Sequence, residues 1–193
     1  AYLENQHRGR AEIKQEWLAD TEGLILISGN KYSDIGAALQ SNNHGAAGAL
    51  VKAWSEHFPN RFYLELQRTA TNDSTQEALI SKILSLASQH DLPVVATHPI
   101  QFITSDDFMA HEARTCIAEG YMLADSRRPK NFTQDQYFKT QAQMCALFVD
   151  IPEALANTVE IAKRCNLTIT LGKNYLPNFP TPNNEGLDAY LIQ

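Results

Sequence analysis

The residues of this sequence that could hold a metal ion or move a proton are few and widely spaced. Three short apolar segments, 24–27, 61–67 and 94–97, are each followed by polar residues. A metal-dependent hydrolase needs several His, Asp or Glu side chains that converge on one point and activate a water molecule. Glu65 and His98 are the good ligands near these segments, and two isolated ligands do not make a site. We therefore expect His98 to be a partly buried, hydrogen-bonded structural histidine.

The other titratable groups also favour structural roles. Asp107 and His111 are four residues apart, which predicts a local ion pair or hydrogen bond between them on a helix. Glu112 follows His111, but position 115 is Thr115, so the two-histidine helical zinc motif is absent. The cysteines lack metal-ligand spacing, and we expect reduced thiols packed on helix faces, at Cys116, Cys145 and Cys165.

A basic loop is the one local feature that could contact an anion. Arg127, Arg128 and Lys130 lie close to Phe132. This combination could touch a phosphate backbone or an acidic protein surface. A solvated loop whose cations pair with neighbouring carboxylates explains it equally well, so both interpretations stay open.

The composition sets limits on partners and location. The chain has 193 residues, 44% of them apolar, and a net charge of −6. That is enough apolar sequence for a sizeable core, while the acidic balance makes the whole surface a poor polyanion binder. No apolar run approaches the ~20 residues that a membrane span needs. We expect a cytoplasmic protein with no membrane partner.

The first half of the chain alternates between strand and helix patterns. In order, the expected elements are a strand at 24–27, a helix at 47–58, a strand at 61–67, a helix at 74–90 and a strand at 94–97. Ser74 and Glu77 have the spacing of a helix capping box. The alternation predicts an α/β fold with parallel strands, whose functional groups lie at the carboxyl ends of the strands.

The second half predicts more helix and a final strand. We expect helices from Asp106 to Gly120, over 134–148, and from a capping box at Asp150 and Glu153 to about Cys165. Residues 167–171 alternate threonine with apolar residues and predict a strand. Residues 174–184 hold three prolines and predict an extended connector.

Several segments together resemble one protein family. The segments are LPVVAT at 92–97, DDFMAHEAR at 106–114, MCALF at 144–148, and DIPEALANT at 150–158. Their order and spacing are similar to the alpha subunits of bacterial DNA polymerase III, and within these to the PHP (polymerase and histidinol phosphatase) domain. The resemblance implies the C-terminal portion of a distorted (β/α)7 barrel over residues 1–172. It also implies a connector over 173–193 that leads toward the polymerase palm.

The resemblance also implies which site residues have been lost. Metal-binding members carry a histidine shortly after the second of these strands, where this chain has Thr69. They carry Asp-x-His after the next strand, where this chain has Pro99 and Gln101, and His98 stands in place of an Asn. Threonine and glutamine bind transition metals poorly, and a proline side chain does not bind them. The expectation is a chain with no catalytic, cofactor or metal residues, and with Mg²⁺ held in the palm of the parent protein.

The favoured hypothesis is a metal-free brace and docking domain within a DNA-directed DNA polymerase. Its partners would be the proofreading exonuclease subunit, the clamp, the clamp loader and template DNA. One alternative is a metal-dependent phosphoesterase with residual proofreading or pyrophosphatase activity, using His98 and Glu65. Another is a stand-alone α/β binding module unrelated to replication.

Overall fold

The structure is a computed structural model that describes most of the chain. The described residues are 5–7, 10–18, 22–69, 73–174, 180–181 and 186–192. The chain forms two compact units, Ala1–Lys163 and Arg164–Gln193, which are described separately here. The first unit begins with short elements: antiparallel strands β1 (Gln6–His7) and β2 (Arg10–Ala11), and the 3-10 helix η1 (Gln15–Leu18). No helix in the described part of the chain is long and apolar enough to cross a membrane.

A three-stranded parallel sheet is the centre of the first unit. Its strands are β3 (Leu26–Ile27), β4 (Phe62–Gln67) and β5 (Val94–Thr97), in the order β3-β4-β5. The register places Leu64 opposite Val94 and Gln67 opposite Thr97. The predicted α/β class and parallel strands are confirmed. β3 is shorter and less buried than the 24–27 pattern suggested, because Leu24 and Ile27 are about half exposed.

Helices α1 (Asp34–Gln40), α2 (His44–His57) and α3 (Ser74–His90) connect the strands. Helices α2 and α3 match the predicted ranges closely, whereas α1 was not predicted. Side chains cap the amino-terminal ends of these helices, since Ser33 accepts from the amide of Gly36 and Asn43 accepts from that of Ala46.

Both predicted capping boxes are wrong. The N-cap of α3 is Asp73, whose carboxylate accepts from the amide of Thr75 at 2.9 Å, so Ser74 is already the first helical residue. Helix α6 (Pro152–Arg164) starts two residues after Asp150. The side chains of Glu77 and Asp150, which the prediction used as caps, instead bind Arg68.

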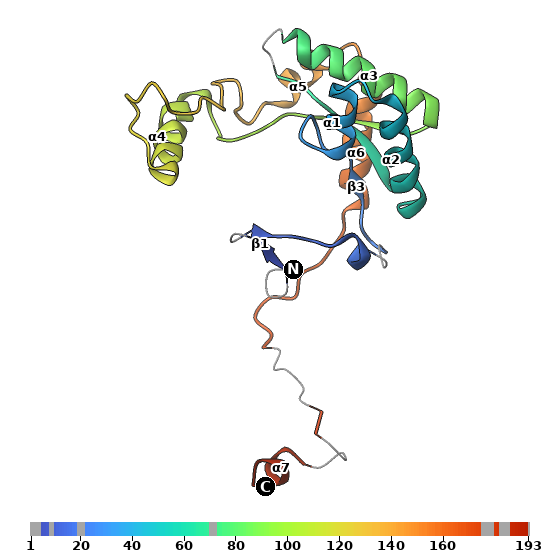
Figure 1. The fold of residues 1–193 in the computed structure, drawn as a ribbon, viewed down its shortest axis with the longest axis vertical. Helices are drawn as coiled ribbons and strands as arrows, with labels where there is room; N and C mark the ends of the chain where they lie inside the picture. The colour runs from blue at the N-terminus through green and yellow to red at the C-terminus, as the bar shows by residue number, and fades with distance from the viewer. Residues whose placement is uncertain are drawn as a thin grey trace. The chain divides into compact units, whose positions relative to one another are not determined.

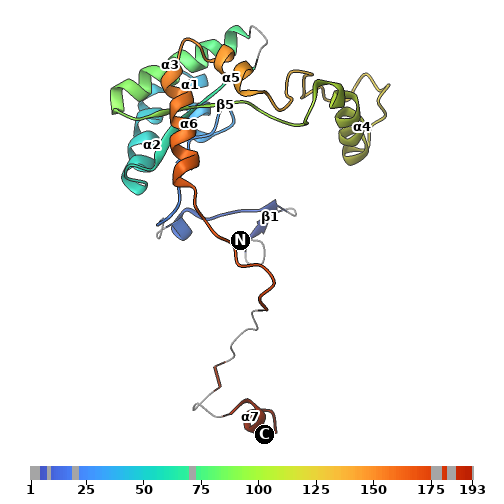
Figure 2. The same cartoon turned by 180° about the vertical axis from the view of Figure 1, so that it is seen from behind.

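The core lies on one face of β4. Phe62, Leu64 and Leu66 alternate along the strand, and each is at most 2% exposed. They belong to one buried cluster with residues of α1, α2, α3 and α6. Figures 1 and 2 show α6 behind α1 and α2 in one view and in front of them in the other. Asn157 on α6 donates a hydrogen bond to the carbonyl of Val94 at 2.8 Å, which ties α6 to β5.

The segment after β5 contains the 3-10 helix η2 (Ser105–Asp107), helix α4 (Phe108–Glu119) and helix α5 (Gln141–Leu147). The prediction for α4 is confirmed within two residues. The predicted helix at 134–148 starts late, because Thr140 and Gln143 form a capping box that begins α5. Residue Tyr137, which lies before this cap, is extended and pairs with Phe102.

The second unit differs from the prediction. Residues 167–171 form no strand, and Leu167, Ile169 and Leu171 are all largely exposed. A strand is stable only when its backbone pairs with a neighbour, and in this unit the described residues offer none. Among its described residues, this unit contains the short helix α7 (Leu187–Ile192). Most of the predicted connector at 174–184 lies outside the described residues.

Candidate functional site

The carboxyl ends of the three parallel strands meet at one edge of the sheet, as predicted. A cavity of about 750 Å³ lies there. Its lining includes residues that follow each strand, namely Asn30 after β3, Thr69 after β4, and Pro99 and Gln101 after β5. Glu65 and Gln67 of β4 also line it. The residues that could have carried a metal site in a related fold therefore do come together around a common space.

Several polar side chains in this cavity are hydrogen-bonded to a neighbouring side chain or to the backbone. Glu65 accepts a hydrogen bond from the Thr97 hydroxyl at 2.6 Å, and the amide group of Asn30 donates to Gln67. The side-chain oxygen of Gln76 accepts from the backbone amide of Thr69 at 2.9 Å. Most of the hydrogen-bonding groups in these contacts are carboxamides and hydroxyls, and the carboxylate of Glu65 is the exception among them.

His98 does not face this cavity. It is 9% exposed and lies in the lining of a second, mainly apolar cavity of about 610 Å³. Its Nδ1 is 2.8 Å from the carbonyl oxygen of Arg68, and its Nε2 is 2.9 Å from that of Asp135. A metal ion needs open space beside a ring nitrogen, and here a carbonyl oxygen occupies the space next to each of the two nitrogens. The structure therefore does not bring His98 and Glu65 into one site, and the buried, hydrogen-bonded histidine is confirmed.

The remaining residues at this edge are held through main-chain contacts. The carbonyl of Pro99 accepts from the side chain of Gln136 at 3.1 Å, and the backbone amide of Gln101 donates to the carbonyl of Gln136 at 2.8 Å. Among the described residues, no three His, Cys, Asp or Glu side chains are grouped so that they could hold a metal ion.

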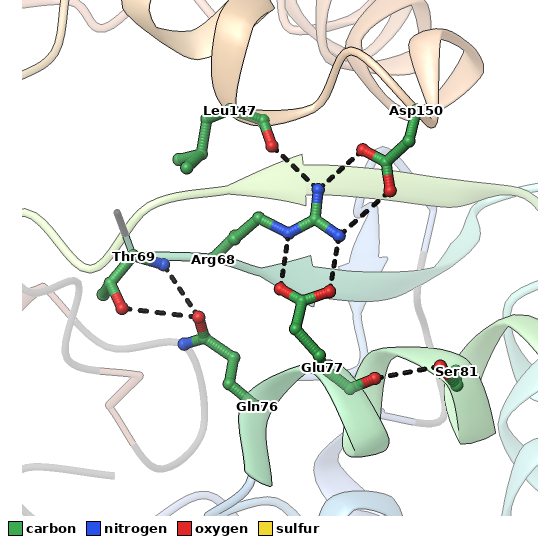
Figure 3. A network of polar contacts seen from close by, with 7 residues as sticks. All are labelled: Arg68, Thr69, Gln76, Glu77, Ser81, Leu147 and Asp150. Atoms are coloured by element: carbon green, nitrogen blue, oxygen red, sulfur yellow. Dashed lines mark hydrogen bonds and ion pairs between the residues drawn. The ribbon is translucent and has the colours of Figure 1, made fainter. Parts of the chain in front are cut away.

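Arg68 is the central polar residue beside the strand ends, and the sequence did not predict it. It is 8% exposed, and its guanidinium forms paired hydrogen bonds with Glu77 at 2.9 and 2.8 Å and with Asp150 at 2.7 and 3.1 Å. Figure 3 shows the two carboxylates on different sides of the guanidinium, with the carbonyl of Leu147 as a further acceptor at 2.7 Å. The ring of Phe148 lies 5.1 Å from the guanidinium carbon.

The charges of this cluster stabilise one another. The hydrogen bond to Asp150 and the nearby carboxylates raise the pKa of Arg68, which stays protonated. Hydrogen bonding to Arg68 lowers the pKa of the Asp150 carboxyl below its usual value. Arg68 follows β4, and its buried charge links this strand to α3 and to the residues just before α6. The carboxylates that balance the charge lie 9 and 82 residues away along the chain, at Glu77 and Asp150.

The predicted contact between Asp107 and His111 is wrong. Asp107 accepts from the backbone amide and the hydroxyl of Thr104, both at 2.9 Å, and these bonds lower its pKa. The Nδ1 of His111 faces Arg114 at 3.3 Å, while its buried Nε2 has no hydrogen-bond partner. The His111 ring lies edge-on to Phe132, with the ring centres 4.6 Å apart.

The basic loop is largely neutralised by its own neighbours. Arg127 pairs with Asp125 at 2.8 Å, and this contact lowers the pKa of Asp125. Arg128 pairs with Glu112, and the two side chains are 14% and 4% exposed. Lys130 is exposed. The structure thus favours the self-paired loop over an open cationic patch.

The cysteines are free thiols in two environments. Cys116 is buried on α4 as predicted. Cys145 and Cys165 are exposed, so the prediction that they pack on helix faces is wrong for both.

Comparison with known proteins places these features in one family. The PHP domain family matches residues 1–69. The chain is 52% identical over 185 residues to the DNA polymerase III subunit alpha of Neisseria meningitidis serogroup A, covering 95% of this chain and 16% of that protein. It is 48% identical over 192 residues to the same subunit of Pseudomonas aeruginosa, covering 98% of this chain and 16% of that protein. The chain is 47% identical over 182 residues to the same subunit of Escherichia coli K12, covering 94% of this chain and 15% of that protein.

These matches agree with the resemblance seen in the separate sequence motifs. The chain spans about a sixth of the length of the curated relatives that it matches. Along nearly its whole length the chain is similar to one segment of the bacterial DNA polymerase III alpha subunits, and its first 69 residues match the PHP domain family.

Proposed function

We propose that this chain is a segment of a replicative DNA polymerase and that the segment braces the polymerase without catalysing a reaction itself. The observation that carries this proposal is the chemistry of the strand-end cavity. Its lining is dominated by carboxamides and hydroxyls, including Asn30, Gln67 and Thr69, which are bonded to one another or to the backbone. Such groups position loops by hydrogen bonding, and they are weak ligands for transition metals.

The carboxylates of this cavity are also engaged. Glu65 accepts from Thr97, and Asp73 caps helix α3. His98 faces a different cavity. A hydrolytic centre that activates water needs ligands with free lone pairs around one point, so these arrangements favour a structural role.

The wider function follows from the relatives. We propose that the full-length polypeptide is a DNA-directed DNA polymerase of chromosome replication that acts in the cytoplasm. Nucleotidyl transfer, with its Mg²⁺, would belong to a palm domain outside this chain. The proofreading exonuclease subunit, the clamp, the clamp loader and template DNA would be its partners. Within this scheme residues 1–172 form the C-terminal portion of a PHP-type (β/α)7 barrel, and residues 173–193 connect it to the palm.

The test uses the full-length protein and separates the two halves of the proposal. Primer extension on a primed template measures polymerase activity. Metal analysis after dialysis against a chelator, together with hydrolysis of nitrophenyl phosphate, measures a metal-dependent phosphoesterase. His98→Ala is compared with His44→Ala, because His44 is exposed on α2.

We expect primer extension, no zinc or manganese that depends on His98, and no phosphoesterase activity. Bound zinc or manganese that is lost in His98→Ala and kept in His44→Ala would overturn the structural role and support the phosphoesterase. Absence of primer extension in a folded full-length protein would overturn the polymerase assignment.

A further inference from the structure

Helix α4 has its polar and apolar faces reversed. The side chains that it buries are His111, Glu112 and Cys116, at 3–6% exposure. The large apolar side chains that it exposes are Met109, at 61%, and Ile117, at 84%. An ordinary surface helix shows the opposite arrangement, with its apolar stripe against the core.

The apolar residues of this face form one continuous strip, in which Met109, Ala110 and Ile117 are exposed and Ala113 is half-buried. Since each residue of an α-helix turns by about 100°, Met109, Ala113, Ile117 and Ala110 fall within about 100° of arc. We call these four residues the α4 strip. It contains no charged or polar side chain, and exposed apolar residues lie beyond both ends of the helix, at Ile103 and Met122, with exposures of 77% and 79%.

The buried face is held firmly in place. Glu112 pairs with Arg128 from the following loop, and the ring of His111 packs against Phe102 and Phe132. Removing one partner of a buried ion pair is strongly destabilising, so α4 cannot simply rotate to hide its apolar strip. The orientation that exposes Met109 and Ile117 is therefore built into this segment.

Nothing in the described part of the chain covers the α4 strip. The described contacts of helix α4 lie on its buried face, with Phe102, Arg128 and Phe132, and no other helix lies beside it in either view (Figures 1 and 2). Leaving a side chain of this size in water forgoes about 1.5–3 kcal/mol of burial free energy. Contiguous exposed apolar surface marks an interaction site, whereas single exposed apolar residues are common.

Building on the proposed function, we propose that the α4 strip docks against another domain of the same polypeptide. The relatives are about six times as long as the part this chain aligns with, so a large tethered mass lies outside these 193 residues. A tether keeps such a domain at a high effective concentration, which favours an intramolecular contact over a diffusing partner. The lack of charge in the strip fits a permanently covered interface, because contacts that form and dissolve carry more polar surface.

The test is site-specific crosslinking in the full-length protein. A photoreactive phenylalanine analogue replaces Ile117 in one variant and Glu119 in the matched control, because Glu119 is exposed on the same helix outside the strip. After irradiation, the crosslinked peptides are identified by mass spectrometry. Each variant is also assayed for primer extension, which reports on the proposed function separately.

We expect the Ile117 position to crosslink to a peptide from outside residues 1–193, within one polypeptide. The yield should not change when the protein is diluted about tenfold, as expected for a tethered contact. The Glu119 position should give little of this product. A product with the mass of two chains would overturn the proposal in favour of self-association. A product that forms only when a separate subunit is added, or equal products from both positions, would also overturn it.

Discussion

The Nδ1 atom of His98 lies 2.8 Å from the main-chain carbonyl oxygen of Arg68, and this contact joins the residues that follow β5 and β4. The other ring nitrogen reaches the carbonyl of Asp135, so a single imidazole links three segments. The residue directly before Pro99 and Gln101, where the resemblance to PHP domains predicts the lost metal motif, is thus used for a structural cross-link. This arrangement explains why a histidine can be placed at a strand end without belonging to a metal site.

Replacing His98 should reduce stability. We expect His98→Phe to lower the free energy of unfolding by about 1–3 kcal/mol, because a ring is kept while a hydrogen-bond donor to a buried carbonyl is lost. Urea denaturation followed by circular dichroism measures the change. His44→Phe is the control, since His44 is exposed, and it should shift the free energy by less than about 0.5 kcal/mol. Equal effects of the two substitutions would contradict the cross-link.

The ion pairs of Arg68 should contribute to the stability of the fold. Asp150→Asn keeps the shape of the side chain and removes one of the two carboxylates that balance the buried guanidinium. We expect a loss of about 1.5–3 kcal/mol of unfolding free energy, the range for hydrogen bonds to charged groups. Glu56→Gln is the matched control, because Glu56 pairs with Lys52 at 4.0 Å and both side chains are about 70% exposed. A control effect as large as that of Asp150→Asn would show that Arg68 does not organise this region.

The same cluster predicts a pH dependence. Arg68 holds the pKa of Asp150 below its usual value, so the unfolded chain binds more protons than the folded chain between the folded and unfolded pKa values. Stability is therefore fully present above about pH 4 and falls as the pH drops through that window. Urea midpoints measured from pH 7 to pH 3 test this. Asp107 and Asp125 also have lowered pKa values, so Asp150→Asn should reduce the acid sensitivity without abolishing it.

The sequence predicted the sheet and its strand-end edge but not the contacts that decide the role of that edge. Apolar residues recur at regular spacing in helix α2, helix α3 and strand β4. Such a pattern can be recognised from the local sequence alone. Helix α1 was missed because it has seven residues, too few for a clear period. The strand predicted at 167–171 was wrong because a strand depends on a partner, which local alternation cannot supply.

For the candidate site too, the sequence predicted where the residues lie but not which contacts they make. Strand order in an α/β fold brought Glu65, Thr69 and Gln101 around one cavity, as the alternation of elements predicted. The side chain of His98 was assigned correctly as structural, but its partners are the carbonyls of Arg68 and Asp135, which no sequence pattern marks. Arg68 was missed because a buried arginine is recognisable only through its acceptors, and Asp150 lies 82 residues away.

The buried ion pair under α4 predicts local rather than global loosening. In Glu112→Gln the guanidinium of Arg128 stays in place with a weaker acceptor, so α4 and the loop that follows it should open more often. Hydrogen exchange measured by mass spectrometry should speed up over residues 108–128 and stay unchanged in β4. Glu119→Gln, which changes an exposed residue in the last turn of the same helix, should leave exchange as it was. Faster exchange throughout the sheet in Glu112→Gln would contradict a local role.

A pair of glycines gives the sharpest test of the fold around the strand-end cavity. A methyl group added at Gly36, in α1, would lie 2.1 Å from the carbonyl oxygen of Asn30 and 2.9 Å from the Cα of Lys31. Both are backbone atoms, so the loop that carries Asn30 into the cavity would have to move. We expect Gly36→Ala to cost about 1–3 kcal/mol of unfolding free energy, as for overpacking of a core.

Gly45→Ala is the natural counterpart because Gly45 also lies in a helix, α2, and the nearest atom to its added methyl group would be 3.9 Å away. Here the substitution removes the entropy cost of glycine without a clash, and we expect a gain of up to about 1 kcal/mol. Thermal and urea unfolding of the two variants should therefore shift in opposite directions. If Gly36→Ala did not destabilise the protein, the close approach of α1 to the Asn30 loop would be wrong, and with it the geometry of the cavity that Asn30 lines.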